Sequence, residues 1–226
     1  MLEQFYYKKR VLVTGGSGFI GKYLQEELFN CGAVITIIDK NPQYAKSINV
    51  IKCDICDYKN LEKVINDISP EIVFHLAANI DRTSEFDIIR NMISVNLIGT
   101  LNLLESLKNI SSCRSIIVAG TSEEYGNNQA PFKEYYKEDP ISPYSFSKVC
   151  ASYLSKMLFN VCKLPIIILR PTLAYGPGQK GTMFIPTLIK TLLLNEKFVM
   201  TSGEQTRDFI YIDDLVNAFC EISATH

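Results

Sequence analysis

Short runs of branched apolar residues alternate along the chain with longer stretches in which apolar residues recur at helical spacing. The unbroken apolar runs are typical of strands buried on both faces of a parallel sheet, and the helical spacing is typical of helices that cover such a sheet. The pattern predicts strands at 11–13, 34–38, 50–53, 71–76, 116–119 and 166–169. It predicts helices at 22–29, 57–68, 86–108 and 144–161, and another that begins near 213, for which Asp214 is the candidate N-cap.

Strands and helices therefore alternate from the beginning of the chain, with no internal repeat and no linker-like tract. This order is typical of an α/β fold with a doubly wound parallel sheet of the Rossmann type. In such sheets ligands bind outside the carboxyl ends of the strands. Residues that follow the predicted strands are therefore the first candidates for a functional site.

A glycine-rich turn joins the first predicted strand to the first helix. Gly15, Gly18 and Gly21 form a GxxGxxG pattern. One glycine allows the sharp turn, one lets backbone N–H groups approach a pyrophosphate, and one lets the helix pack closely on the sheet. Phosphates would lie at the helix N-terminus, where unpaired N–H groups and the helix dipole favour negative charge. The alternative interpretation is an ordinary tight turn.

Acidic residues follow the second and third predicted strands. Asp39 lies 18 residues beyond Gly21, about where a dinucleotide fold places the carboxylate that binds the ribose 2′-hydroxyl. That carboxylate would repel a 2′-phosphate, so the pattern favours NAD over NADP, and the neighbouring Lys40 weakens this preference. Asp54 can reach the adenine amino group from the end of its strand. The alternative for Asp39 is a residue that starts a turn.

Two other candidate positions have structural interpretations. His75 ends the fourth predicted strand, and we expect a hydrogen-bonded core residue there rather than a catalyst. Cys53 and Cys56 have the CxxC spacing but lack a second cysteine pair and a nearby histidine, so we expect no metal site. The alanines at 77 and 78 are small enough for a cofactor to approach the backbone closely.

Composition excludes several classes of protein. The 226 residues are 47% hydrophobic and carry a net charge of −1, with acids and bases evenly spread, so neither a nucleic-acid surface nor a membrane surface is indicated. No apolar run is long enough for a membrane span, and residues 1–10 lack the apolar core of a signal peptide. Seven scattered cysteines are typical of reduced thiols, so we expect a cytoplasmic protein.

The predicted helix at 86–108 is apolar on nearly every side. A helix of this kind must be buried all round, and the sheet can cover only one of its faces. We therefore expect a homodimer in which the helices at 86–108 and 144–161 meet a second copy of the chain.

A tyrosine and a lysine near the start of the helix at 144–161 are candidates for acid–base chemistry. Tyr144 and Lys148 are four residues apart, so their side chains share one face of the helix. A phenol titrates near about 10 in water, and a nearby ammonium favours the phenolate. Thr121, after the fifth predicted strand, can donate a hydrogen bond to the same substrate oxygen. The alternative is a solvated helix turn.

Together these positions resemble the extended short-chain dehydrogenase/reductases, in the NAD-dependent epimerase/dehydratase branch that acts on nucleotide sugars. The resemblance extends from about residue 10 to 222. It rests on motifs in the family's order: Thr14–Gly21, Asp54–Ile55, His75–Ala78, Asn96 with Gly99–Thr100, Thr121 with Tyr125–Gly126, and Tyr144 with Lys148.

The resemblance implies that Thr121, Tyr144 and Lys148 are the catalytic group, and that bound NAD takes hydride from a sugar carbon. It implies that Arg207 holds the substrate diphosphate, for which a planar guanidinium is well suited. Ser122 and Thr121 would contact the substrate. The positions expected to contact NAD are Gly15, Gly18, Phe19, Ile20, Gly21, Asp39, Asp54, Ile55, Leu76, Ala77, Ala78, Asn96, Tyr144, Lys148 and Pro171.

Departures from the family pattern bear on the reaction. Dehydratases of the family carry an Asp-Glu pair after the catalytic threonine, and here Ser122 and Glu123 occupy those places. Glu123 can still act as a base, but the acid is missing. Leu173 stands where many relatives carry an asparagine that contacts the substrate phosphates. The string from Glu123 to Gly126 also resembles that of 4-ketoreductases.

Relatives also continue beyond the position of His226. We therefore expect an NAD-binding Rossmann domain at 1–171 and a partial, truncated substrate-binding lobe at 172–226. Three functions remain open: a nucleotide-sugar epimerase, a 4-ketoreductase or 4,6-dehydratase on the same scaffold, and a catalytically idle NAD-binding sensor or partner subunit. Substrate specificity would come from the segments at 79–86, 127–139 and 176–186.

Overall fold

The computed structural model describes residues 1–43, 48–81 and 83–225 of the chain. Within these residues the main sheet has six parallel strands in the order β3-β2-β1-β4-β5-β6. They are β1 Arg10–Thr14, β2 Val34–Asp39, β3 Asn49–Lys52, β4 Ile72–His75, β5 Ser115–Ala119 and β6 Ile166–Leu169. The predicted doubly wound sheet is confirmed. Its strand order reverses between β1 and β4, which is where such sheets bind ligands.

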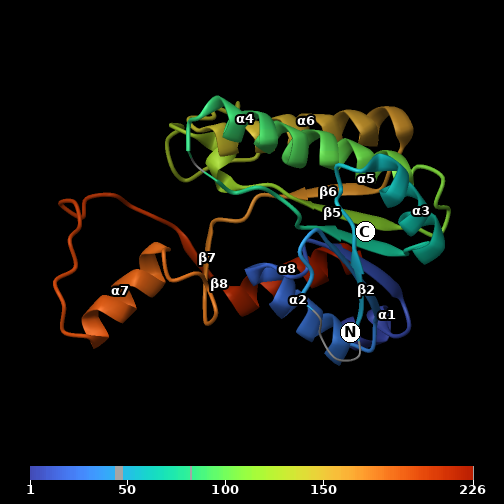
Figure 1. The fold of residues 1–226 in the computed structure, drawn as a ribbon, viewed down its shortest axis with the longest axis horizontal. Coiled ribbons are helices and arrows are strands. Elements are labelled where there is room, and N and C mark those ends of the chain that lie inside the picture. The colour runs from blue at the N-terminus through green and yellow to red at the C-terminus, as the bar shows by residue number, and fades with distance from the viewer. Residues whose placement is uncertain (44–47, 82, 226) are drawn as a thin grey trace.

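Helices cover both faces of this sheet (Figure 1). One layer consists of α1 Leu2–Tyr6, α2 Phe19–Asn30 and α8 Ile212–Thr225. The other consists of α3 Tyr58–Ile68, α4 Phe86–Ile93, η1 Ser94–Ile98, α5 Gly99–Leu107 and α6 Pro143–Cys162. The N-cap of α3 is Asp57, whose side chain accepts a hydrogen bond from the Asn60 N–H, as expected for an acid before a helix.

The central strand β1 is fixed by apolar packing on both sides. Val11 and Val13 belong to the core cluster shared with α2 and α8, whereas Leu12 belongs to the cluster shared with α3 and α5. All three side chains are fully buried. Side chains that alternate across a strand make this double anchoring possible. The carboxyl end of β1, where the glycine turn begins, is therefore held in a fixed position.

The stretch predicted as one helix at 86–108 consists of three consecutive parts. A π-helical turn, η1, lies between α4 and α5. The hydrophobic pattern does not reveal this turn, because a local change of hydrogen bonding leaves the apolar character of the stretch unchanged. Such turns are rare and often lie at functional sites. Here η1 contains Asn96, one of the predicted cofactor contacts.

The C-terminal quarter of the chain has two parts. Strands β7 Leu173–Tyr175 and β8 Phe209–Tyr211 pair in parallel, and α7 Phe184–Leu193 stands apart from the helical layers (Figure 1). The following helix α8 returns to the main sheet and buries Ile212 and Phe219. The domain boundary at residue 171 stays a prediction.

The start of α8 corrects one expectation. Asp214 was expected to cap this helix, but the helix begins at Ile212, so Asp213 and Asp214 lie inside its first turn. Burial of Ile212 directly after β8 fixes the earlier start. Both carboxylates still stabilise the helix, since negative charge is favourable near a helix N-terminus. None of the described helices has the length and hydropathy needed to cross a membrane.

Candidate active site

The glycine turn after β1 forms a cradle that side chains would fill. Gly15 has a φ of +70°, and a Cβ at this position would lie 2.6 Å from the backbone N of Ala77. Gly18 is the N-cap of α2 and, having no side chain, caps none of its N–H groups. These unpaired N–H groups and the helix dipole suit a phosphate. The turn therefore fits a dinucleotide pyrophosphate.

Asp39 lies beside this turn at the end of β2. Its carboxylate accepts hydrogen bonds from the N–H groups of Ser17 (3.2 Å) and Asn41 (2.9 Å). The neighbouring Lys40, which weakened the predicted preference for NAD, points elsewhere: its ammonium lies 2.8 Å from Asp54. Partial burial opposes ionisation of Asp54, but the hydrogen bond from Lys40 and further contacts with Cys56 hold its pKa below the usual value.

A buried polar network joins the ends of β1 and β4 to η1 and α5. His75 is 2% exposed, and its ring nitrogens lie 2.7 Å from the Thr14 hydroxyl and 2.9 Å from the Thr100 hydroxyl. Thr100 donates to the carbonyl oxygen of Asn96, so it accepts from Nε2–H of the histidine. Burial, together with the Lys148 charge, lowers the His75 pKa to about 3. As predicted, His75 is a neutral, hydrogen-bonded core residue.

Asn96 connects the segment after β4 to the first turn of α6. Its amide oxygen accepts from the Asn79 N–H (2.7 Å), and its amide nitrogen donates to the Asn79 carbonyl oxygen and to Ser147 (2.8 Å). The Ser147 hydroxyl donates in turn to the carbonyl oxygen of Tyr144. The side chain of Asn96 thus holds the turn that carries Tyr144. A direct contact of Asn96 with NAD stays a prediction.

Thr121, Tyr144 and Lys148 lie on segments that meet at the same edge of the sheet. Thr121 follows β5 and is 8% exposed, with a hydroxyl oxygen that accepts from the Glu123 N–H at 3.3 Å. Helix α6 begins at Pro143 after the Ser142 cap, which places Tyr144 and Lys148 on adjacent turns of its N-terminal end. Burial lowers the pKa of the Lys148 amine to about 8, and the Glu124 carboxylate partly opposes this effect.

The two glutamates after Thr121 have different environments. Glu123, the predicted base, is half-buried. Glu124 is fully buried in the short helix η2 Ser122–Tyr125, and its carboxylate accepts from the Thr121 N–H (2.9 Å) and from Nε of Arg170 (2.8 Å). The sequence interpretation did not single out Glu124. The spacing of Thr121 and Glu124, a capping box, was the signal that could have identified it.

The remaining predicted residues lie farther along the chain. The Pro171 carbonyl oxygen accepts from the Ser122 N–H at 2.9 Å, which ties the end of β6 to the turn after β5. Arg207 is exposed and donates to the Thr206 carbonyl oxygen, so its contact with a substrate diphosphate stays a prediction.

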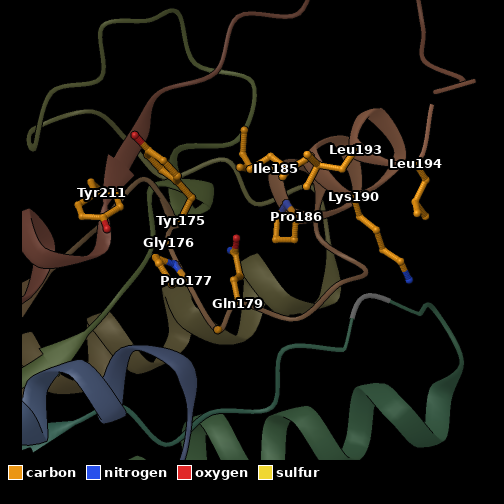
Figure 2. Close-up of a pocket in the computed structure, with 12 residues that line it drawn as sticks. Tyr175, Gly176, Pro177, Gln179, Ile185, Pro186, Lys190, Leu193, Leu194 and Tyr211 are labelled. Carbon is orange, nitrogen blue, oxygen red and sulfur yellow. The ribbon is translucent and has the colours of Figure 1, made fainter. Parts of the chain in front are cut away.

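A cavity of about 600 Å³ lies between β7, β8, the 176–186 segment and α7. Figure 2 shows the side chains that line it, which are mainly apolar and include Tyr175, Ile185 and Tyr211. Gln179 donates to the Ala174 carbonyl oxygen, and its own side-chain oxygen is buried without a hydrogen-bond partner in the described structure. The cavity therefore offers mainly apolar contact.

Comparisons with known proteins extend over nearly the whole chain. A model of the NAD dependent epimerase/dehydratase family matches residues 11–225. The dTDP-D-glucose 4,6-dehydratase of Dictyostelium discoideum is 33% identical over 93% of this chain and 54% of its own length. The chain therefore spans about half the length of that relative.

Two solved structures have the same fold. The UDP-N-acetylglucosamine 4-epimerase of Methanobrevibacter ruminantium, in complex with UDP-N-acetylmuramic acid, has a TM-score of 0.87 and 30% identity, over 97% of this chain and 74% of that one. The UDP-glucuronic acid 4-epimerase of Bacillus cereus, in complex with UDP-glucuronic acid and NAD, has a TM-score of 0.83 and 31% identity, over 92% of this chain and 71% of that one.

Proposed function

This chain belongs to the NAD dependent epimerase/dehydratase family, and we propose that it binds NAD and inverts one carbon of a nucleotide-activated sugar. The observation that carries this proposal is the placement of two sets of residues at one edge of the sheet. The glycine turn and Asp39 follow β1 and β2, and Thr121, Tyr144 and Lys148 follow β5 or begin α6. One set suits a dinucleotide, and the other suits proton transfer.

The cofactor site is supported by the donors and acceptors that the chain offers. N–H groups at the start of α2 would hold the pyrophosphate, and Asp39 would accept from the adenosine ribose hydroxyls. The Asp39 carboxylate would repel the 2′-phosphate of NADP. Because the Lys40 ammonium is paired with Asp54, it does not offset this repulsion. Bound NAD supplies a reversible hydride acceptor.

Side chains of this protein would transfer the proton of the sugar hydroxyl. Tyr144 would remove the proton of the sugar hydroxyl as the carbon is oxidised and return it on reduction. The Lys148 ammonium would favour the phenolate form, since an opposite charge nearby stabilises it. The Thr121 hydroxyl oxygen already accepts from Glu123, so its hydrogen can donate to the same sugar oxygen.

Epimerisation is favoured over dehydration by the residues after Thr121. Loss of water needs an acid and a base besides the tyrosine, and Ser122 stands in the place of the acid. Epimerisation and ketone reduction need no such pair. The related dTDP-D-glucose 4,6-dehydratase keeps dehydration as the second candidate reaction, and the Glu123–Gly126 string keeps 4-ketoreduction as a third. An idle NAD-binding protein would bind NAD but convert no sugar.

One experiment separates these reactions. Purified protein is incubated with a panel of UDP- and dTDP-sugars, with and without NADH, and products are followed by NMR. Inverted sugar without net NADH loss supports epimerisation. A 4-keto-6-deoxy product indicates dehydration, and stoichiometric NADH loss indicates reduction. If NAD binds and no sugar is converted, the proposed reaction is wrong.

Asp39→Ala should change the cofactor preference. We expect the affinity for NAD to fall about tenfold, because a ribose hydrogen bond to a charged acceptor is lost. NADP should bind more tightly than it does to the wild type, because the repulsion of its 2′-phosphate is removed. Calorimetric titration with each dinucleotide measures both changes, with Asp67→Asn on the exposed side of α3 as the charge-matched control. Unchanged affinities for both dinucleotides would refute the role of Asp39.

We also propose that the protein forms a homodimer through α4 and α6. A stripe of exposed apolar side chains follows α6 at intervals of seven and four residues, and its members include Phe146, Tyr153, Met157 and Val161. On the adjacent α4, Phe86 is 77% exposed. A self-complementary apolar stripe of this kind is typical of an isologous interface.

Met157→Glu should therefore dissociate the dimer, because it places a charge in the centre of the stripe. Sedimentation equilibrium should give about twice the chain mass of 25.5 kDa for the wild type and the single-chain mass for the variant. Val199→Glu, at a side chain that is 92% exposed and far from α6 in the sequence, is the control and should remain dimeric. A wild-type mass of one chain at micromolar concentration would contradict the proposal.

A further inference from the structure

A fully buried carboxylate lies behind the proposed catalytic group. Glu124 is 0% exposed, and each of its two oxygens accepts a hydrogen bond from an N–H donor, one from the Thr121 backbone and one from Arg170. Burial raises the pKa of this carboxyl, and the Arg170 charge and the hydrogen bonds oppose the rise. Since both oxygens act as acceptors, the ionised carboxylate is the form that fits the site.

The neighbours of Glu124 place it between β5 and α6. Gly120 directly follows β5, and a Cβ there would lie 2.5 Å from a Glu124 oxygen. The carboxylate can therefore pack against this backbone only because the residue is glycine. On the other side, α6 packs against η2, the short helix that carries Glu124. Ser152 and Lys148 are both buried and lie four residues apart on α6, so they share one face of that helix.

Lys148 lies in a dry environment. The residue is 6% exposed, and the Glu124 carboxylate acts against the lowering of its pKa by burial, whereas His75 on β4 is neutral. Arg170 pairs with Glu124 through Nε and with Glu138 through Nη2, at 2.7 Å. Electrostatic interactions are stronger in such a dry site than in water. A single buried carboxylate therefore has a large influence on the protonation of Lys148.

We propose that Glu124 is a positioning residue of the active site: its carboxylate fixes the backbone of Thr121 and is the buried counter-charge that keeps the Lys148 side chain an ammonium at neutral pH. This inference rests on the proposed function of Thr121, Tyr144 and Lys148. Without the carboxylate, burial would favour the neutral amine, which gives no support to a Tyr144 phenolate. Arg170 holds Glu124 in place through the hydrogen bond from its Nε at 2.8 Å.

The test is an NMR titration of Lys148 in lysine-labelled protein, with the signal assigned by its disappearance in Lys148→Arg. In the wild type the midpoint should lie near pH 8. Glu124→Gln keeps the size of the side chain and removes its charge, so the midpoint should move down by about one pH unit. The fall of kcat at high pH should move in the same direction. The titration needs neither NAD nor sugar, so its outcome does not depend on the proposed reaction.

Glu138→Gln is the matched control, because it removes the other carboxylate bound to Arg170. Its Lys148 midpoint should equal that of the wild type. If Glu124→Gln fails to fold, as judged by circular dichroism, the double variant Glu124→Gln with Arg170→Gln removes both charges. Its midpoint should also move down, by less than in Glu124→Gln, because the positive charge of Arg170 is lost as well. An unchanged midpoint in the folded Glu124 variant, or an equal move in Glu138→Gln, would overturn the proposal.

Discussion

Tyr144→Phe is expected to lower kcat for nucleotide-sugar conversion by about 10²- to 10⁴-fold, the usual contribution of a positioned acid or base. In the proposed mechanism the phenol exchanges a proton with the sugar hydroxyl, and phenylalanine cannot replace it. Because α6 begins with the Ser142 cap and the Asn96 network holds the turn through backbone atoms, the fold and the affinity for NAD should stay the same.

Steady-state kinetics by NMR and calorimetric NAD titration measure the two effects separately. Tyr58→Phe is the control, since it removes a phenol that donates to Glu62 on α3, outside the site. Full turnover by Tyr144→Phe with every sugar that the wild type accepts would show that another group transfers the proton. Loss of NAD affinity in the same variant would mean that the Tyr144 hydroxyl also holds the cofactor.

Gly15→Ala is expected to abolish NAD binding and to lower the free energy of unfolding by at least about 2 kcal/mol. A non-glycine residue at positive φ costs about 1–3 kcal/mol, and overpacking adds a similar amount. The added Cβ would meet the backbone of Leu76 and Ala77, which cannot move aside as a side chain can. It would also displace the segment after β4, which faces the proposed pyrophosphate site.

Urea unfolding and NAD titration check this prediction. Gly203→Ala is the control, because Gly203 has a φ of +80° and a Cβ there would meet only the end of the Met200 side chain, at 3.4 Å. The control should lose stability from the backbone strain alone and keep its affinity for NAD. A Gly15→Ala protein that binds NAD as tightly as the wild type would refute the assignment of the turn.

The sheet and the glycine turn were predictable because their signals are local. A strand such as β1 is a run of apolar residues, and the turn after it is a run of glycines next to each other in the chain. The positions of Thr121, Tyr144 and Lys148 could also be predicted, because the ends of parallel strands lie along one edge. In each case the residues that determine the local structure are close together in the sequence.

The parts that could not be predicted depend on distant partners. A glutamate is seldom fully buried, and what makes this possible for Glu124 is Arg170, which lies 46 residues away, directly after β6. The ion pair of Lys40 with Asp54 depends likewise on the packing of β2 against β3. The π turn at Ser94–Ile98 changes only the hydrogen-bond pattern of a helix, which apolar periodicity does not report.

The central claim is that a sugar carbon is inverted by hydride transfer that this protein directs. It is tested most directly by running the conversion of a UDP-sugar in deuterated water and measuring deuterium at the inverted carbon by NMR. Hydride that leaves and returns without contact with solvent keeps the original hydrogen, so the account predicts an inverted product free of deuterium at that carbon. Deuterium at the inverted carbon, or no inverted product from any of the sugars, would contradict it.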